Sequence, residues 1–133
     1  MPRLDEIMRE RTRPLLMGIV NVTGDSFSEG GASSPATAVD RALALLDEGA
    51  DLLDIGGEST RPGAAVIPAD EESLRVVPVL RELRKLRPSA ILSVDTRKAG
   101  VARAALDCGV VTTHIGRVPE DRASGRWANM LSA

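Results

Sequence analysis

The sequence predicts an α/β protein that forms part of a parallel (β/α)8 TIM barrel. Short apolar runs alternate with segments of helical period between residues 15 and 115, in the order strand, helix, strand, helix, strand, helix, strand. This alternation is typical of right-handed crossover connections in a parallel sheet. A polar loop follows each of the first three apolar runs, at the strand end where barrels place their chemistry. The sequence contains neither a GxGxxG pattern nor a P-loop, which favours a barrel over a dinucleotide-binding fold.

Composition and charge exclude several classes of function. A chain of 133 residues can bury one modest core, so we expect one domain. A formal net charge of −2 and only two aromatic residues, Phe27 and Trp127, provide neither a basic surface nor stacking platforms for nucleic acid. No apolar run approaches the roughly 20 residues of a membrane span, and the charged N-terminus is unlike a signal peptide. The single cysteine fits a reducing, cytoplasmic location.

The chain divides into three stretches. Residues 1–14 are charged and are expected to be a leader with at most a frayed turn of helix. Residues 15–115 carry the alternating elements of the partial barrel. Residues 116–133 show no hydrophobic period, so we expect an irregular tail there.

Four apolar runs mark the strands. They are Leu15–Val20, Leu52–Ile55, Ala90–Val94 and, more weakly, Val110–Ile115. Continuous apolar runs of this length are typical of strands that are buried on both faces of a parallel sheet.

Helices are expected between these runs. Ser34 and Pro35 predict the N-cap and first turn of the first helix, and Gly49 its end. The second helix begins at acidic residues 70–72 and contains Pro78, which should kink or split it. The third helix is expected to end at Gly109. The predicted buried stripe of the second helix consists of Leu74, Val77, Leu80 and Leu83, and that of the third of Val101, Ala104, Ala105 and Cys108.

The stretch from Asp51 to Gly63 joins an apolar strand to a polar loop. Its glycines let the backbone approach a ligand closely. Ser59 and Thr60 offer hydroxyl groups, and Arg61 offers a planar fork of donors that suits phosphate or carboxylate. An ordinary strand-to-helix turn has a similar composition, so an anion-binding loop and a plain turn both remain open.

A second polar loop follows the first strand. Asn21 and Asp25 bring side-chain oxygens of the kind that divalent cations prefer. Asx turns and helix capping would use the same residue types. From the residues alone, a cation site and a capping role both remain open.

Cys108 lies in an Ala-rich helical pattern, with His114 nearby in the sequence. Together they could form a nucleophilic Cys–His pair. The favoured interpretation of Cys108 is a small buried core residue, because free cysteines behave as small apolar side chains.

Three motifs, in this order and spacing, resemble those of the dihydropteroate synthases. The stretch from Met17 to Ser28, MGIVNVTGDSFS, resembles the first signature of that family. The stretch from Asp54 to Ala64, DIGGESTRPGA, resembles the second. Ser93–Thr96 and helical residues 101–106 resemble the third strand and the helix after it. The resemblance runs from about Leu15 to Gly109 and implies the N-terminal half of a pterin-binding barrel.

The resemblance implies an enzyme of folate biosynthesis. Such enzymes condense 6-hydroxymethyl-7,8-dihydropterin pyrophosphate with para-aminobenzoate to 7,8-dihydropteroate and release pyrophosphate. It also implies Mg2+ as a cofactor and small molecules as partners. The residues to which it points are Asn21 as the magnesium ligand, Thr23, Asp25, Ser26 and Phe27 as a loop that closes over the substrates, Thr60 and Arg61 as contacts to pyrophosphate or aminobenzoate, and Asp95 as the hydrogen-bond partner of the pterin ring.

The residue types fit this chemistry. A leaving pyrophosphate needs a metal and cationic donors, such as Arg61, to carry its developing charge. The pterin methylene then becomes electron-poor, and the carboxylates of Asp25 and Asp95 would stabilise it. The neutral nitrogen of aminobenzoate attacks, so no strong general base is required. Asp25, Asp95 and Arg61 are therefore the expected catalytic residues.

Three features depart from the pattern of that family. Gly24 stands where proline is common, so a more flexible loop is expected. His114 stands where a pterin-binding asparagine is usual, and it is expected at the surface rather than as a ligand. A complete barrel needs about 250 residues, whereas this chain has 133, so it looks truncated.

The short chain leaves two other interpretations open. One is a non-catalytic half-barrel that binds a pterin or an anion, or that pairs with another half. The other is a fragment that does not fold stably by itself. A half-barrel exposes sheet edges and apolar faces, which favours association, and a homodimer is one expected form.

Overall fold

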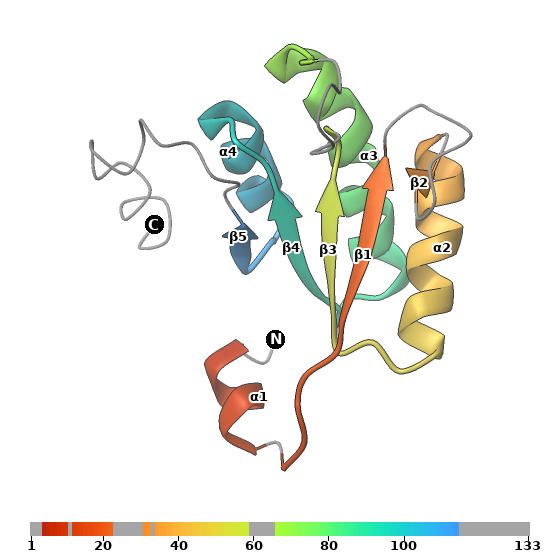
Figure 1. Cartoon of the computed structure of the whole chain (residues 1–133), viewed down its shortest axis with the longest axis vertical. Helices are drawn as coiled ribbons and strands as arrows, with labels where there is room; N and C mark the ends of the chain where they lie inside the picture. The colour runs from red at the N-terminus through yellow and green to blue at the C-terminus, as the bar shows by residue number, and fades with distance from the viewer. Residues whose placement is uncertain (1–3, 11, 23–30, 33, 59–65, 115–133) are drawn as a thin grey trace.

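The computed structural model describes residues 4–10, 12–22, 31–32, 34–58 and 66–114. They form a layer of parallel strands with helices packed against it (Figure 1). In chain order the elements are α1 (Leu4–Glu10), β1 (Met17–Val22), β2 (Gly31–Ala32), α2 (Pro35–Asp47), β3 (Leu52–Gly56), α3 (Ala69–Leu86), β4 (Ile91–Asp95), α4 (Ala99–Asp107) and β5 (Thr112–His114).

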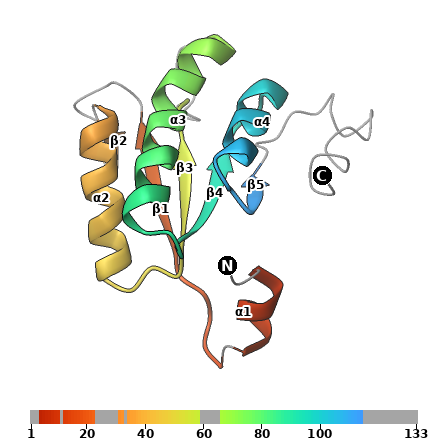
Figure 2. The ribbon, with the colours of Figure 1, turned by 180° about the vertical axis from the view of Figure 1, so that it is seen from behind.

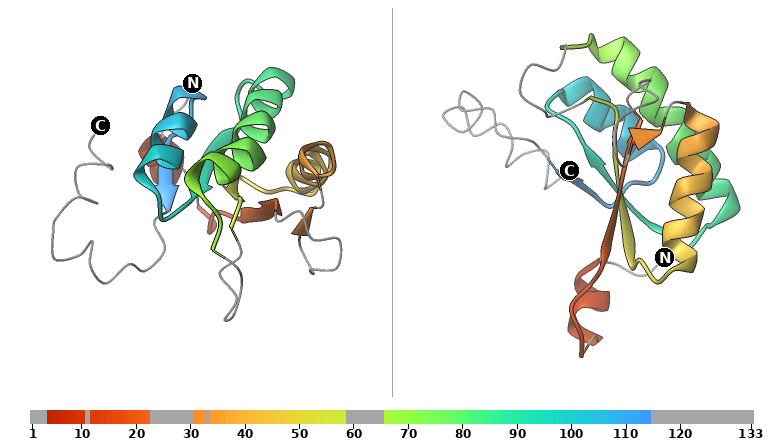
Figure 3. Two further views of the ribbon diagram at one scale, coloured as in Figure 1. Left: turned by 90° about the horizontal axis from the view of Figure 1, so that it is seen from above. Right: turned by 45° about the vertical axis from the view of Figure 1, so that its right-hand side comes forward.

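The described strands form one sheet in the order β2-β1-β3-β4-β5, and each neighbouring pair is parallel. Strands β1, β3, β4 and β5 follow one another as the consecutive (β/α) units of a barrel do. Helices α2, α3 and α4 cover the same face of the sheet (Figure 2, Figure 3). A doubly wound sheet would carry helices on both faces, so the architecture is that of the predicted partial barrel.

The side chains of β1 alternate between the two faces of the sheet. Gly18, Val20 and Val22 are buried toward the helices. Met17 and Ile19 lie on the other face and are 49% and 57% exposed. We call this second surface the open face; in a closed barrel it would line the interior. Register continues the open face over β3 and β4 in three rows, which are Met17–Leu52–Ile91, Ile19–Asp54–Ser93 and Asn21–Gly56–Asp95.

The hydrophobic core lies between the sheet and the helices. Helix-facing strand residues such as Val20, Leu53 and Val94 are fully buried. Burying one large aliphatic side chain contributes on the order of 1.5–3 kcal/mol. The helices supply Ala38, Val39 and Ala42 from α2, Val76, Val79, Leu80 and Leu83 from α3, and Ala105 from α4.

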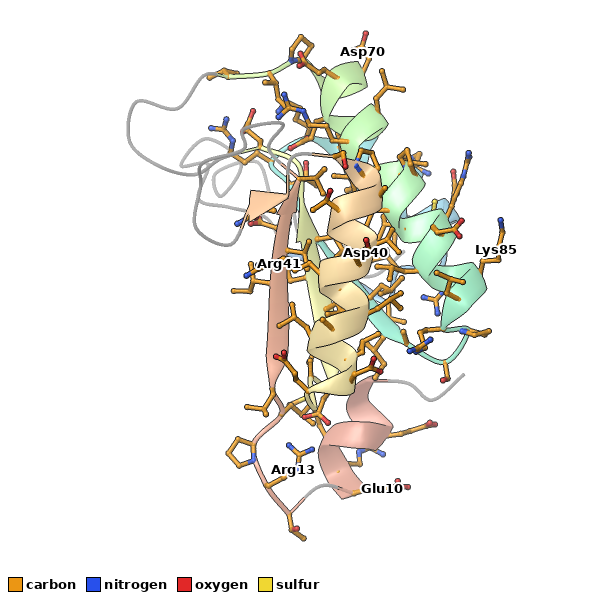
Figure 4. The ribbon with its side chains drawn as sticks, turned by 90° about the vertical axis from the view of Figure 1, so that its right-hand side faces the viewer. Glu10, Arg13, Asp40, Arg41, Asp70 and Lys85 are labelled. Carbon is orange, nitrogen blue, oxygen red and sulfur yellow. The ribbon has the colours of Figure 1, made fainter. Side chains whose placement is uncertain are left out.

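The segment that enters β1 is tied to the start of β3. Arg13 donates from both terminal guanidinium nitrogens to the two carboxylate oxygens of Asp51, each at 3.1 Å. The backbone N–H of Leu16 donates to the same carboxylate at 2.9 Å. Figure 4 shows Arg13 at the end of the molecule that carries α1. Helix α1 itself has seven residues and is more regular than the frayed turn expected for the leader.

Most predicted boundaries agree with the structure. Helix α2 begins at Pro35 after the N-cap Ser34, whose hydroxyl accepts a hydrogen bond from the N–H of Thr37 at 3.2 Å. Gly49 and Gly109 follow α2 and α4 with positive φ angles of 112° and 83°, which favour glycine. Strand β1 begins and ends two residues later than expected. Strand β2 was not predicted, because its two residues carry no hydrophobic pattern.

The predicted buried stripe of α3 is partly wrong. Leu74 is 73% exposed, whereas Leu80 and Leu83 are fully buried. A strict spacing of three residues falls about 60° short of a full turn at each step, so Leu74 and Leu83 lie on opposite sides of the helix. The buried residues of α3 are Glu72, Val76, Val79, Leu80 and Leu83.

Pro78 does not split α3, which continues as one helix from Ala69 to Leu86. Proline removes the N–H that would bond to the carbonyl four residues earlier. Pro78 and Leu74 are both exposed, so this side of the helix faces away from the core. Of the two expected outcomes, a kink or a split, the split did not occur.

Helix α4 buries a slightly different set of residues from the one predicted. Val101 and Ala105 are buried as expected, but Ala102 is buried in place of Ala104. Cys108 is partly buried and packs against the core as a free thiol. This packing supports the interpretation of Cys108 as a core residue.

Candidate functional site

The row formed by Asn21, Gly56 and Asp95 lies at the C-terminal ends of three neighbouring strands. Backbone register pairs Gly56 with each of the other two. A Cβ built on Gly56 would lie 3.0 Å from Oδ1 of Asn21 and 3.7 Å from Cβ of Asp95. Both polar residues therefore lie at the same strand ends, on the open face. Their roles as metal ligand and pterin partner stay predictions.

Gly56 leaves room for the amide of Asn21. A side chain at this position would have to displace the amide, because 3.0 Å is shorter than ordinary van der Waals contact. The row continues to β5, where the backbone of His114 is in register with Asp95. His114, expected at the surface, therefore sits at the same strand end as the candidate site residues.

Asp54 lies one row deeper on the open face. It is 6% exposed, and its Oδ1 has no hydrogen-bond partner in the part of the chain that the structure describes. Its neighbour in the row, Ser93, is 1% exposed. A buried polar group without a hydrogen-bond partner costs about 1–3 kcal/mol of folding free energy. Such groups are uncommon in folded proteins. Asp54 is therefore a further polar group on the open face.

Glu58 joins the segments that follow β3 and β4. Its side chain is 6% exposed, although it lies outside the helices and strands. Arg97 donates to Oε1 from Nε at 2.8 Å and also from a terminal guanidinium nitrogen. Lys98 donates to Oε2 from Nζ at 2.8 Å. Two cations of one loop thus hold a carboxylate of another.

Burial and hydrogen bonding act on Glu58 in opposite directions. Burial raises the pKa of its carboxyl group, because the charged form loses water. Hydrogen bonds from Lys98, from Arg97 and from the backbone N–H of Ile67 at 3.3 Å lower the pKa, as does the charge of Lys98. The pKa of Glu58 ends below the ordinary value of a glutamate, so this carboxylate is ionised at neutral pH.

Glu72 of α3 supports the loop that follows β4. It is 1% exposed, and its Oε2 accepts a hydrogen bond from the hydroxyl of Thr96 at 2.9 Å. The Nζ of Lys98 lies 3.6 Å from the same oxygen of Glu72. The backbone N–H of Lys98 donates to the Thr96 hydroxyl at 3.1 Å. We call the set of Glu58, Glu72, Thr96, Arg97 and Lys98 the Glu58 cluster.

The backbone between β3 and Glu58 packs closely on α3. A Cβ built on Gly57 would lie 2.7 Å from Cγ2 of Val76 and 3.1 Å from Cγ of Glu72. Arg75 donates to the carbonyl oxygen of Gly57 at 3.1 Å. Glycine is needed here because the helix leaves no space for a side chain.

Several predicted site residues lie outside the described residues. They belong to the segment after β1 and to the segment after Glu58, and nothing in the structure tests their roles. They are Thr23, Asp25, Ser26, Phe27, Thr60 and Arg61. The expected irregular tail, residues 116–133, also lies outside the described residues.

Sequence reasoning assigned no role to Asp54 or to the Glu58 cluster. Asp54 is a carboxylate inside an apolar run, and that mismatch was the available signal. The pairs of Glu58 with Arg97 and Lys98 span 39 and 40 residues. No local pattern connects residues that far apart.

The described residues include no group of three or more His, Cys, Asp or Glu side chains that could hold a metal ion. Asn21 offers one amide oxygen at the strand ends. Mg2+ commonly keeps several waters and takes few protein ligands beside substrate phosphates. The chemistry of Asn21 therefore fits a Mg2+ ion that is bound largely through a substrate.

None of the helices described is long and apolar enough to cross a membrane.

A family described as "Pterin binding enzyme" matches residues 17–114. The chain belongs to this family. The match covers the row of Asn21, Gly56 and Asp95, the Glu58 cluster, and the helices α2, α3 and α4. It ends at the last residue of β5.

Curated relatives with similar sequences include dihydropteroate synthases. The enzyme of Bacillus subtilis is 48% identical over 100 residues, which make up 74% of this chain and 35% of the relative. A probable bifunctional folylpolyglutamate synthase/dihydropteroate synthase of Haloferax volcanii is 52% identical over 95 residues, or 71% of this chain and 11% of the relative. The chain thus spans about a third or less of these relatives.

Solved structures give the same result. The dihydropteroate synthase of Xanthomonas albilineans with 4-aminobenzoic acid is similar with a TM-score of 0.67 and 54% identity, covering 74% of this chain and 36% of that one. The Burkholderia cenocepacia enzyme complexed with 7,8-dihydropteroate has a TM-score of 0.62 and 49% identity, covering 74% and 31%. Both fold and family therefore agree with the resemblance found in the sequence.

Proposed function

We propose that this chain is part of a dihydropteroate synthase, which joins 6-hydroxymethyl-7,8-dihydropterin pyrophosphate to para-aminobenzoate. The observation that carries the proposal is the row of Asn21, Gly56 and Asp95 on the open face. Related structures of this fold hold 4-aminobenzoic acid or 7,8-dihydropteroate. A cytoplasmic location fits the proposal, because the one cysteine of the sequence is a free thiol.

In the proposed reaction, the bond between the pterin methylene carbon and the pyrophosphate oxygen breaks. A bond from the aminobenzoate nitrogen to that carbon forms, and the nitrogen releases a proton. Asp95 accepts hydrogen bonds from the pterin ring and, with Asp25, stabilises the electron-poor methylene group. Arg61 and Thr60 bind the pyrophosphate or the aminobenzoate. Thr23, Ser26 and Phe27 cover the bound substrates and exclude water.

Asn21 would hold Mg2+ through its amide oxygen, and the ion would supply positive charge to the leaving pyrophosphate. The amide is held over Gly56, with its Oδ1 3.0 Å from the position of a Cβ on that residue. This geometry supports the proposal that Asn21 orients the leaving group next to Asp95.

A second candidate function is a non-catalytic half-barrel that binds a pterin or an anion, or that pairs with a complementary half. It is favoured by the exposure of Met17 and Ile19 on the open face.

Pterin binding can be tested with pteroic acid, using calorimetry on the full chain. We expect wild type to bind and Asp95→Asn to weaken binding about tenfold or more, because a charged hydrogen-bond acceptor becomes neutral. Asp40→Asn is the matched control, since Asp40 is an exposed residue on the outer side of α2 (Figure 4). Equal affinities of all three proteins would contradict the assignment of Asp95.

Catalysis is tested separately by measuring pyrophosphate release. We expect the isolated chain to turn over well below about one cycle per second, the low end of ordinary enzymes. Groups that the family brings from later strands are not among its 133 residues. Turnover in the ordinary range would favour the complete enzyme over the non-catalytic half-barrel.

A further inference from the structure

The Glu58 cluster is electrically balanced. It combines two carboxylates, Glu58 and Glu72, with two cations, Arg97 and Lys98. The two carboxylate side chains are 6% and 1% exposed. Cations that already pair with buried carboxylates have little free charge for an anion, and removing a carboxylate would leave them uncompensated. The cluster is therefore arranged as a connection between loops and not as an anion site.

The cluster joins the first residues of two loops. Glu58 immediately precedes segment 59–65, which contains Thr60 and Arg61. Arg97 lies two residues after Asp95, at the end of β4. Each loop is also anchored to α3, one through Gly57 and the other through the hydrogen bond from Thr96 to Glu72.

We propose that Glu58 is a positioning residue that fixes the loop after β3 relative to Asp95. It acts through Arg97 and Lys98, because its two carboxylate oxygens are already engaged by them. The inference rests on the proposed function, in which Asp95 binds the pterin and segment 59–65 binds the other reaction partner. Glu58 then sets the distance between the pterin methylene and the aminobenzoate nitrogen, and this distance governs the rate of bond formation.

The connection can be measured without any ligand, by hydrogen exchange on the full chain. Glu58→Gln keeps the shape of the side chain but removes its charge. We expect exchange to rise about tenfold in residues 57–58 and 66–67 and also in residues 95–98, because the contacts of Glu58 restrain both sets. Glu82→Gln is the matched control, since Glu82 pairs with Lys85 at 3.5 Å on the exposed side of α3. Faster exchange in only one of the two segments would overturn the proposal.

A double-mutant cycle tests whether Glu58 acts through Lys98. Glu58→Gln, Lys98→Met and the double variant are compared by the same exchange rates. We expect the double variant to exchange no faster than the faster single variant, because each change removes the same contact. Independent, multiplying effects would show that Glu58 and Lys98 are not coupled.

Ligand binding separates positioning from general loss of structure. Pteroic acid would span both loops, whereas 6-hydroxymethylpterin would reach only the pterin site beside Asp95. We expect Glu58→Gln to weaken the binding of pteroic acid about tenfold. The affinity for 6-hydroxymethylpterin should stay within about twofold, since only pteroic acid needs the two loops in a fixed relative position. An equal loss for both ligands would indicate a merely structural role. If wild type bound neither ligand, the proposed function would fail, while the exchange experiment would still decide the role of Glu58 as a connection.

Discussion

Glu58 is ionised at neutral pH because hydrogen bonds from Lys98 and Arg97 outweigh the effect of its burial. A carboxyl group with a lower pKa in the folded state than in the unfolded state stabilises the fold whenever it is charged. This stabilisation is complete above the unfolded pKa of about 4.3. It is lost as the pH falls through the lower folded pKa.

This linkage predicts a pH-dependent effect of Glu58→Gln. At about pH 7 the variant should unfold at lower urea concentration than wild type, because Arg97 and Lys98 lose their carboxylate partner. The gap between the two proteins should shrink as the pH falls below the unfolded pKa of about 4.3 and on through the lower folded pKa of Glu58, where the carboxylate of wild type takes up its proton. Urea midpoints from about pH 7 to about pH 3 measure it, with Glu82→Gln as control. A gap that stays constant over this range would contradict the linkage.

Arg61 carries a second prediction at the scale of one residue. We expect magnesium pyrophosphate to bind the chain with millimolar rather than micromolar affinity, a difference of roughly 4 kcal/mol. Any residue whose backbone becomes fixed on binding costs about 1–2 kcal/mol. Arg61→Ala should abolish the binding, because Arg97, the cationic fork after β4, is already paired with Glu58. Equal calorimetric heats from wild type and variant would show that Arg61 is not part of an anion site.

The site residues that could be predicted are those whose position follows from a strand. Asn21 and Asp95 each close an apolar run, and parallel strands bring their ends together. Glu58 could not be assigned in this way, because its partners are 39 and 40 residues further along the chain. The sequence alone does not distinguish charged loop residues that are solvated from those that form ion pairs.

At the scale of elements, Gly57 decides how closely β3 and its loop approach α3. Gly57→Ala would place a Cβ 2.7 Å from Cγ2 of Val76, so strand end or helix must shift. We expect a loss of about 1–3 kcal/mol in the free energy of unfolding. Gly100→Ala is the matched control, since a Cβ there meets nothing within 4 Å and Gly100 lies in α4. That variant should gain about 0.5–1 kcal/mol.

Urea denaturation of both glycine variants measures the difference. The opposite signs matter more than the sizes, because the same methyl group is added in each case. If Gly57→Ala were as stable as wild type, the close packing of this loop on α3 would be wrong.

The sequence was sufficient for elements that carry their own boundary signals. Ser34 and Pro35 start α2, and Gly49 and Gly109 follow helix ends, each through local backbone chemistry. The buried face of α3 was predicted only in part, because the expected stripe used a strict spacing of three residues, which drifts around the helix. A mixed spacing of three and four residues connects the buried Val76, Val79, Leu80 and Leu83. The burial of Glu72 could not be predicted from its position, because its partner Thr96 lies 24 residues further along the chain.

At the scale of the whole molecule, the open face is the unusual feature. Helices α2, α3 and α4 cover one side of the sheet, as Figure 2 shows. On the other side Met17 and Ile19 remain 49% and 57% exposed. A closed barrel would cover this side with further strands. Exposed apolar positions on a sheet face, next to unpaired strand edges, favour association.

Ile19→Lys tests whether the open face drives association of this chain. We expect wild type to form dimers or larger species as its concentration rises, and the variant to remain mostly monomeric, because a charge in the contact must lose its water. The fold should tolerate the change, since position 19 is 57% exposed and is in register with the carboxylate of Asp54. Leu74→Lys is the matched control, because Leu74 is 73% exposed on the outer side of α3. Sedimentation velocity over a wide range of concentrations measures the masses. A wild type that stays monomeric throughout, or two variants that shift equally, would mean that the open face is not the surface through which this chain associates.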